Sequence, residues 1–287
     1  MRTFLIFLFF SFTCLMHGFC SGQSVHMAAQ AHLGSVFSQS AVSVSNGLHT
    51  VPRFLRIKPN KIKRYYPRSL SEARGFYSNG YLVNASALPM EGDGFVKIER
   101  LRDRHYGTEE MIDHLKTIGR LFAQEFPDSA RIQIGDLGVK KGGKITMHTS
   151  HQNGLDVDIA MIAVDEVEQD PDREHFDEDF VKDSKLLPSF DIEENWAVVR
   201  LAALNTSVER IFVAKEIKLE FCKLHGDSAD GKKTLHVLRP LGNHSDHFHI
   251  RFACPKDDKK CKAQTPVPAG DGCFELQTGA EDSSEEF

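Results

Sequence analysis

The chain has 287 residues, which is enough for one large domain or two small ones. Hydrophobic residues make up 41% and charged residues 26%, the composition of an ordinary soluble globular protein. The formal net charge of −5 gives no general case for nucleic acid as a partner, because nucleic-acid binders are usually basic.

The N-terminus has the pattern of a targeting segment. Arg2 supplies a positive charge, and the apolar stretch 4–16 that follows is too short to span a bilayer comfortably. Small residues then lead to a cleavage point after Cys20 or Gly22, so residues 1–22 are expected to be a secretory signal peptide. Lipidation of Cys20 is the alternative. No second apolar run is long enough for a membrane helix, so no integral span is expected after cleavage.

The charge of the remaining chain is unevenly distributed. Residues 23–69 are first small and polar and then basic, which predicts a flexible leader. Its basic part could instead lie against an anionic polymer such as a cell wall or a membrane surface. A folded domain is expected over 70–275, followed by an acidic tail at 276–287.

Four cysteines remain once the signal peptide is removed. Cys222, Cys254, Cys261 and Cys273 in an exported chain predict two disulfides, for which three connectivities are open. Free buried thiols are the alternative reading.

Hydrophobic periodicity predicts three helices and four strands. A helix begins at a Thr108 N-cap with acidic residues in its first turn. A turn at 140–144 and an acidic, irregular surface excursion at 165–190 interrupt the pattern. Because strands and helices do not alternate regularly, an α+β domain around an antiparallel sheet is favoured over a parallel doubly wound sheet. In chain order the sequence predicts a helix at 108–126, strands at 131–134 and 155–162, a helix at 192–205, a strand at 211–214, a helix at 215–225 and a strand at 247–252.

Two short blocks, 148–158 and 244–249, concentrate the residues that carry chemistry. His151, Asp158 and His249 supply two imidazoles and one carboxylate, the ligand set of a zinc ion that keeps an open position for water or substrate. The ligand set alone does not exclude iron or manganese. One such histidine would more often be an ordinary surface or core residue. Their grouping in two blocks, with an aspartate on a strand between them, predicts a metal site.

Three further histidines are expected beside the metal. His247 shares a strand face with His249, roughly 7 Å along the backbone, which suits a general base or a group that stabilises the tetrahedral intermediate. His244 and His148 are candidates for the stabilising role. Asp156, on the strand that carries the aspartate ligand, is placed to orient a ligand imidazole. Together these residues predict a hydrolytic zinc site, in which the metal acidifies a water and polarises the carbonyl under attack.

With these residues the chain resembles the penicillin-insensitive murein endopeptidases, zinc peptidases related to the lysostaphin-type enzymes, the D-Ala-D-Ala peptidases and the hedgehog fold. The resemblance runs from about Gly75 to Cys273, and its most specific segments are 148–158 and 246–251. The supporting segments are Tyr77-Ser-Asn-Gly, Ala87-Leu-Pro, Arg104-His-Tyr-Gly, Ile134-Gly-Asp, Arg210-Ile-Phe-Val and Cys254-Pro.

The resemblance implies a periplasmic enzyme that cleaves peptide cross-links of peptidoglycan, chiefly the D-alanyl–meso-diaminopimelyl amide. It also implies a single domain with a central antiparallel sheet flanked by helices and long loops. The family pattern assigns roles residue by residue. It matches His151, Asp158 and His249 to zinc ligands, His247 and His244 to catalytic histidines, and His148 to a further histidine at the site.

The resemblance further implies the disulfides Cys254–Cys261 and Cys222–Cys273. The chain departs from the family in three places, the first of which is a basic leader that is longer than expected. A cysteine that the family often carries near Tyr81 is absent together with its partner. The aromatic pair usual after Arg239-Pro240 is replaced by Leu241-Gly242, which changes the expected shape of the substrate cleft.

Two alternatives to a zinc D,D-endopeptidase stay open at this point. The first is an enzyme with the same zinc site that cleaves a different bond: a D-Ala-D-Ala carboxypeptidase or dipeptidase, or an L,D-cross-link hydrolase. The second is a non-hydrolytic zinc-dependent binding module, against which His247 and His244 argue because a binder needs no base. The sequence gives no indication of oligomeric state.

Overall fold

The computed structural model describes residues 71–204 and 207–278, all within one compact unit of the chain. The predicted signal peptide, the leader and most of the acidic tail lie outside the described residues. Within the described ranges, no helix combines the length and the apolar character needed to cross a bilayer.

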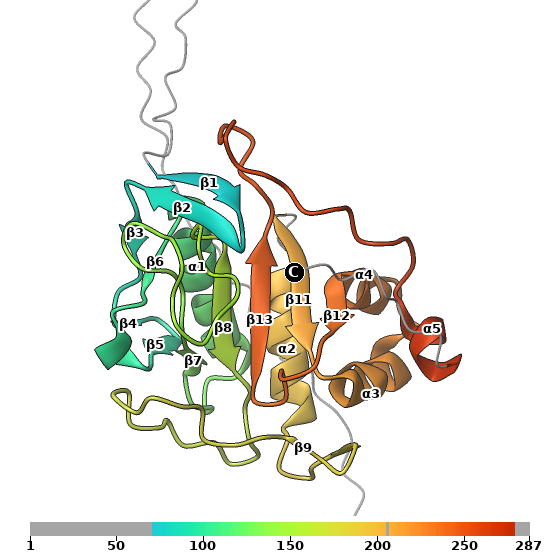
Figure 1. The fold of residues 1–287 in the computed structure, drawn as a ribbon. Coiled ribbons are helices and arrows are strands. Elements are labelled where there is room, and N and C mark those ends of the chain that lie inside the picture. The colour runs from blue at the N-terminus through green and yellow to red at the C-terminus, as the bar shows by residue number, and fades with distance from the viewer. Residues whose placement is uncertain (1–70, 205–206, 279–287) are drawn as a thin grey trace, which may run out of the picture. The chain divides into compact units, whose positions relative to one another are not determined.

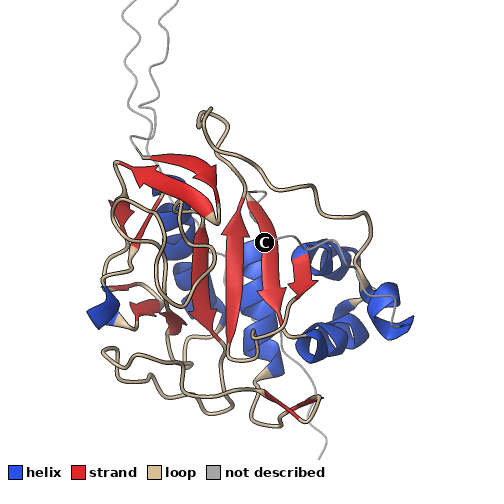
Figure 2. Ribbon diagram, viewed as in Figure 1, coloured by secondary structure: helices blue, strands red, loops and turns tan. Residues whose placement is uncertain are grey.

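A seven-stranded mixed sheet forms the centre of the domain (Figures 1 and 2). Its strands are β4 (Glu91–Gly92), β5 (Phe95–Lys97), β7 (Ile132–Ile134), β8 (Asp156–Ala160), β11 (Val208–Val213), β12 (Leu238–Pro240) and β13 (His247–Phe252). They lie in the order β12-β11-β13-β8-β7-β5-β4. The pairs β11–β12 and β5–β7 are parallel and the other four are antiparallel. The prediction of a domain that mixes helices with a largely antiparallel sheet is confirmed, and the two parallel pairs refine it.

The middle pair of this sheet, β8 and β13, carries most of the predicted site. The two strands run antiparallel in a register that sets His249 opposite Asp158 and Arg251 opposite Asp156. Since side chains alternate between the faces of a strand, both acids and both basic residues lie on one face of the sheet. The alternation proposed for the two blocks is therefore confirmed.

The opposite face of the same two strands is apolar. Val157, Ile159, Phe248 and Ile250 are fully buried and belong to the main hydrophobic core. Each buried side chain of this size contributes about 2 kcal/mol relative to an exposed one. The core thereby fixes which face of each strand is turned to the site.

Helices cover the apolar face, and in Figure 2 the longest two run behind the strands. The described residues form α1 (Glu109–Glu125), α2 (Ile192–Ala203), α3 (Lys215–His225), α4 (Ala229–Val237), α5 (Cys273–Thr278) and a short 3-10 turn, η1 (Arg100–Arg102). The side chains of Thr108 and Asp191 accept the first free backbone N–H groups of α1 and α2. The three helices expected from the sequence are confirmed, whereas α4 and α5 were not predicted.

The sequence also did not predict the small two-stranded elements. These are β1 (Glu72–Phe76) with β2 (Asn79–Val83), β3 (Ser86–Ala87) with β6 (Tyr106–Gly107), and β9 (Val181–Lys182) with β10 (Lys185–Leu186). The expected surface excursion at 165–190 is corrected in part. It is acidic and largely irregular, but it contains β9 and β10 and buries Phe180 and Phe190 in the core.

Two disulfides are formed, Cys222–Cys273 and Cys254–Cys261, which is the pairing that the family resemblance implied. The first joins α3 to α5. The second closes a short loop after β13. In this loop the carbonyl oxygen of Lys260 accepts a hydrogen bond from the backbone N–H of Gly75 in β1.

The two disulfides should differ in their contribution to stability. They close loops with sequence separations of 51 and 7 residues, which correspond to about 4 and about 2.5 kcal/mol of lost chain entropy in the unfolded state. Replacing Cys222 and Cys273 by serine should therefore lower the free energy of unfolding more than replacing Cys254 and Cys261. Urea denaturation followed by circular dichroism measures both, and equal losses would contradict the loop-length argument.

Candidate functional site

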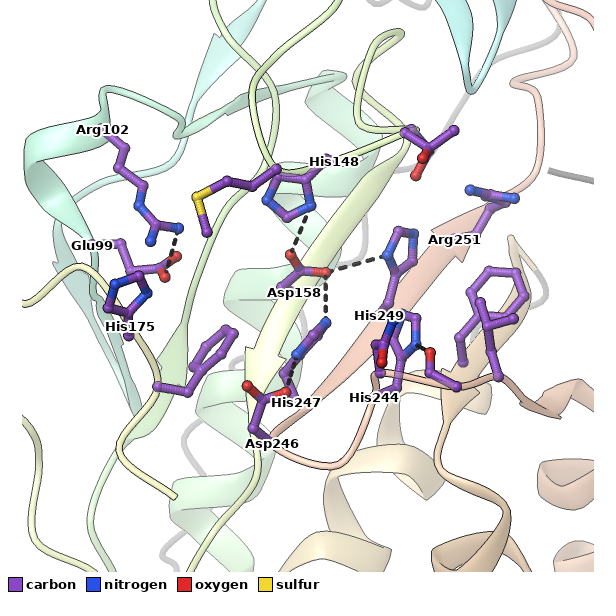
Figure 3. A pocket seen from close by; sticks show the side chains of 18 residues that line it. Glu99, Arg102, His148, Asp158, His175, His244, Asp246, His247, His249 and Arg251 are labelled. Atoms are coloured by element: carbon purple, nitrogen blue, oxygen red, sulfur yellow. Dashed lines mark hydrogen bonds and ion pairs between the residues drawn. The ribbon is translucent and has the colours of Figure 1, made fainter. Parts of the chain in front are cut away.

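A pocket of about 390 Å³ opens on the polar face of β8 and β13 (Figure 3). Of the six metal-ligand and catalytic residues expected from the sequence, five line it: His148, Asp158, His244, His247 and His249. The sixth, His151, is fully buried next to Asp158. The structure thus brings together all six residues from two blocks that are almost 90 positions apart.

Asp158 is at the centre of this group. Its Oδ1 atom lies 3.3 Å from Nε2 of His151, 3.3 Å from Nδ1 of His249 and 3.7 Å from Nε2 of His247. Its Oδ2 atom lies 3.7 Å from Nδ1 of His148. One buried carboxylate is therefore surrounded by four imidazole nitrogens (Figure 3 draws three of the rings).

The far nitrogens of the two buried histidines are held by acceptors. Nδ1 of His151 donates to the carbonyl oxygen of Leu137 at 3.1 Å, and Nε2 of His249 donates to Oδ1 of Asp156 at 3.1 Å. Each ring therefore turns its other nitrogen towards Asp158. This is how metal-ligating histidines are oriented in proteins.

The donor atoms fit a metal ion. Among the described residues, neither Nε2 of His151 nor Oδ1 of Asp158 has a hydrogen-bond partner, although both atoms are buried. Such atoms are rare in folded proteins and need an explanation. His148, His151 and Asp158 offer ligand atoms that all lie within 4.8 Å of one another. Imidazole and carboxylate donors in this arrangement are suited to a divalent transition metal.

The geometry leaves two candidates for the third ligand beside His151 and Asp158. His148 completes the closest cluster of donor atoms, but its Nε2 donates to Oδ2 of Asp136 at 2.9 Å and its Nδ1 faces the other carboxylate oxygen of Asp158. His249 faces the same oxygen as His151, at the same distance.

The electrostatics favour a positive charge beside Asp158. Burial acts to lower the pKa of His151, but the Asp158 carboxylate outweighs it and raises that pKa to about 9. For His249, burial prevails and lowers the pKa to about 4. Burial acts to raise the pKa of Asp158, but the surrounding imidazoles hold it well below its usual range. A bound cation would supply the charge that this buried carboxylate requires.

His247 and His244 lie on the open side of Asp158. Nδ1 of His247 donates to Oδ1 of Asp246 at 2.6 Å, which directs Nε2 towards Asp158. Burial acts to lower the pKa of His247, but Asp158 and Asp246 outweigh it and raise the pKa. Nδ1 of His244 donates to the carbonyl oxygen of Gly242 at 2.8 Å, and burial lowers its pKa. Both residues line the pocket.

The orienting role expected of Asp156 is matched by its contacts. Besides His249, it accepts the backbone N–H of His151 at 3.0 Å and Nε of Arg251 at 2.7 Å. His151 has a φ of 64°, a left-handed conformation that is unusual for a residue with a side chain. The bond from its N–H to Asp156 helps to hold that strained backbone in place.

Several residues at the site were not identified from the sequence. Asp136 accepts bonds from Arg102, Arg104 and His148, all at Oδ2. The Gly-Asp pair that follows a predicted strand could have indicated Asp136. Asp246 likewise stood beside His247 without an assigned role. Other missed residues come from segments with no motif: Glu99, His175 and Phe176 line the pocket.

Leu241 and Gly242, at the positions where the family resemblance led us to expect an aromatic pair, both line the pocket together with His244. A leucine and a glycine form a smaller and more flexible wall than two aromatic rings would.

The same sequence was compared with known proteins. A family model described as penicillin-insensitive murein endopeptidase matches residues 73–285, a range that contains the whole site. A penicillin-insensitive murein endopeptidase of Haemophilus influenzae is 36% identical over 223 residues, which cover 74% of this chain and 75% of the relative. Proteins of the same name from Klebsiella pneumoniae and Escherichia coli O1:K1 are each 30% identical, over 220 residues (72% and 76% covered) and 235 residues (76% and 79% covered).

Removing the charge of Asp156 should destabilise the fold. In Asp156→Asn the Arg251 guanidinium, whose side chain is 5% exposed, loses its carboxylate, so we expect a loss of about 3–5 kcal/mol in the free energy of unfolding. Chemical denaturation measures it. Glu125→Gln is the matched control, because it breaks an exposed pair with Arg200 that should contribute less than about 1 kcal/mol. Equal effects of the two variants would show that the Asp156 pair is not a buried ionic contact.

Proposed function

Because the chain belongs to the penicillin-insensitive murein endopeptidase family, we propose that it hydrolyses the D-alanyl–meso-diaminopimelyl amide in the cross-links of peptidoglycan. Membership of this peptidase family makes the protein an enzyme, which favours hydrolysis over the binding-module alternative. The proposal rests on one observation above all. Nε2 of His151 and Nδ1 of His249 both lie 3.3 Å from Oδ1 of Asp158, beside a pocket that Asp158 and His249 line.

We propose zinc as the metal and His151, Asp158 and His249 as its ligands. Two nitrogens and one carboxylate are the ligand set of several hydrolytic zinc sites. His249 is preferred to His148 because its Nδ1 lies 3.3 Å from the same Asp158 oxygen that His151 faces, whereas Nδ1 of His148 lies 3.7 Å from the other oxygen. Zinc bound there would lower the pKa of a water and polarise the scissile carbonyl.

The residues around the ligands suit the proton transfers of amide hydrolysis. His247 is assigned as the general base, since Asp246 fixes its Nδ1–H and leaves Nε2 free to accept the proton of the attacking water. The same nitrogen can then return that proton to the leaving amine. In this way His247 serves both halves of the reaction.

His244 and His148 are assigned to substrate and charge stabilisation. Because Nδ1 of His244 donates to Gly242 and burial lowers its pKa, Nε2 of the neutral ring is an acceptor that suits a substrate N–H. His148 has a carboxylate beside each of its ring nitrogens, from Asp136 and Asp158. It also lines the pocket, so we assign it the stabilisation of charge on the tetrahedral intermediate.

We further propose that the domain spans 70–275, has the fold shared by the D-Ala-D-Ala peptidases and hedgehog, and acts in the periplasm after removal of residues 1–22. The antiparallel pair β8–β13, which carries Asp158 and His249, supports the fold. The two disulfides support export, because such bonds persist in oxidising compartments.

Digestion of isolated sacculi tests the reaction. The purified chain lacking residues 1–22 should convert cross-linked muropeptide dimers to monomers, as measured by chromatography and mass spectrometry. A strong zinc chelator should abolish this activity, and added zinc should restore it. Loss of terminal D-Ala with intact dimers would instead support the carboxypeptidase alternative. Full activity in metal-free protein would exclude a metal-dependent mechanism.

Four single alanine variants test the assignment of roles. His151→Ala and His249→Ala should lose bound zinc, measured by elemental analysis, and with it all activity. His247→Ala should keep zinc while its turnover falls by about 10²- to 10⁴-fold, the usual contribution of a general base. His148→Ala should also keep zinc. An empty site in His148→Ala with zinc retained in His249→Ala would identify His148 as the third ligand.

A further inference from the structure

The segment 164–179, called here the acidic loop, forms one wall of the pocket and places an aromatic ring against the proposed general base. We propose that Phe176 in this loop is a positioning residue, whose ring holds the His247 imidazole in its working orientation. The inference deepens the proposed function and rests on it for the role of His247. Its evidence is a set of contacts that no sequence motif revealed.

The first contact is a stack between the two rings. The ring centroids of Phe176 and His247 are 4.9 Å apart and their planes differ by 20°. The hydrogen bond from Nδ1 of His247 to Asp246 fixes one edge of the imidazole. A single hydrogen bond still allows the ring to tilt through coupled changes in its χ1 and χ2 torsions. A flat partner on one face removes that freedom, so the two contacts together direct Nε2.

The Phe176 ring is held in place by the sheet on which it packs. It packs on Val96, Ile98 and Ala160, a small apolar cluster on the sheet that is separate from the main core. It also lies against Gly135. A Cβ at position 135 would come within 2.8 Å of the Phe176 ring, so this close approach requires glycine. The ring therefore bridges the sheet and the base.

The acidic loop is tied to the sheet upstream of Phe176. Glu168 makes a bidentate pair with Arg131, with both N–O distances 2.7 Å. Gln133 of β7 donates to Glu166 at 3.0 Å and accepts the backbone N–H of Gln169 at 2.8 Å. Bidentate pairs of this kind add geometric specificity. The loop thus reaches Phe176 from fixed points on β7 and next to it.

A positioning role has a distinct kinetic consequence. Without the ring, His247 should keep its bond to Asp246 but spend less time with Nε2 directed at the reacting water. Small misplacements of a catalytic group can cost about 10²-fold in rate. Substrate affinity and zinc binding should be unaffected, since neither depends on the orientation of His247.

The test uses Phe176→Leu in the zinc-loaded protein, because leucine still fills the apolar cluster but cannot stack. With a purified muropeptide dimer as substrate, kcat should fall by about 10- to 100-fold, while KM and zinc content stay unchanged. Phe126→Leu is the matched control. It also removes a stacked ring, from Phe122 at the end of α1, at 5.1 Å and 24°, and should leave kcat unchanged.

A second readout does not depend on activity. In NMR spectra of the zinc-loaded protein, with His247 assigned by His247→Gln, the imidazole protons should carry a ring-current shift. Phe176→Leu should lose that shift and broaden the signals, whereas Phe126→Leu should not. If the wild-type protein fails to cleave the dimer, the proposed function fails, and these spectra still decide whether Phe176 orders the ring.

Three outcomes would overturn the proposal. A rise in KM at constant kcat would make Phe176 a substrate-binding residue. A loss of zinc would make it part of the structural support of the metal site. Unchanged kcat and unchanged His247 signals would show that the stack has no influence on the base. Glu168→Gln adds a check. The variant breaks the pair with Arg131 and should loosen the acidic loop without altering the apolar cluster, so kcat should fall as it does in Phe176→Leu.

Discussion

The antiparallel pairing of β8 with β13 is the interaction on which the site depends. A shift of one residue in this register would turn every side chain of one strand to the other face. His249 would then leave Asp158 and enter the apolar core, and Phe248 would enter the pocket. The buried set Val157, Ile159, Phe248 and Ile250 makes such a shift costly. The same core that stabilises the sheet thus determines the geometry of the proposed ligands.

Three buried aspartates bind different basic groups around the β8–β13 pair. Asp158 faces the four histidines, Asp156 holds two of the ligand-bearing segments together with Arg251, and Asp136 joins His148 to two arginines. Buried carboxylates are unfavourable unless they are paired, and each of these is paired with basic groups. A site that has its charges balanced in this way is rigid before substrate arrives, which suits catalysis by preorganised electrostatics.

The scaffold and the walls of the pocket differ in how they are built. The residues proposed as ligands and bases lie on two strands and the loops next to them, where regular pairing fixes the strand positions. The walls come from irregular segments, namely the acidic loop with Phe176 and the turn with Leu241-Gly242. Irregular loops tolerate substitution better than paired strands. The expected departure at Leu241-Gly242 accordingly lies in a wall, away from the strands that carry Asp158 and His249.

The sequence by itself determined the helices α1 to α3, the strands β8 and β13, and the residues of the two histidine blocks. These follow from local periodicity and from dense motifs, which need no knowledge of distant contacts. The tertiary structure alone decided the order of the strands, the parallel pairs at the flanks, and the small hairpins, because strand pairing joins segments far apart in the chain. It also placed Asp136 beside His148, and Asp246 and Phe176 beside His247. A lone aspartate or phenylalanine in an irregular segment carries no periodic signal, and its function arises only from the neighbours that folding places beside it.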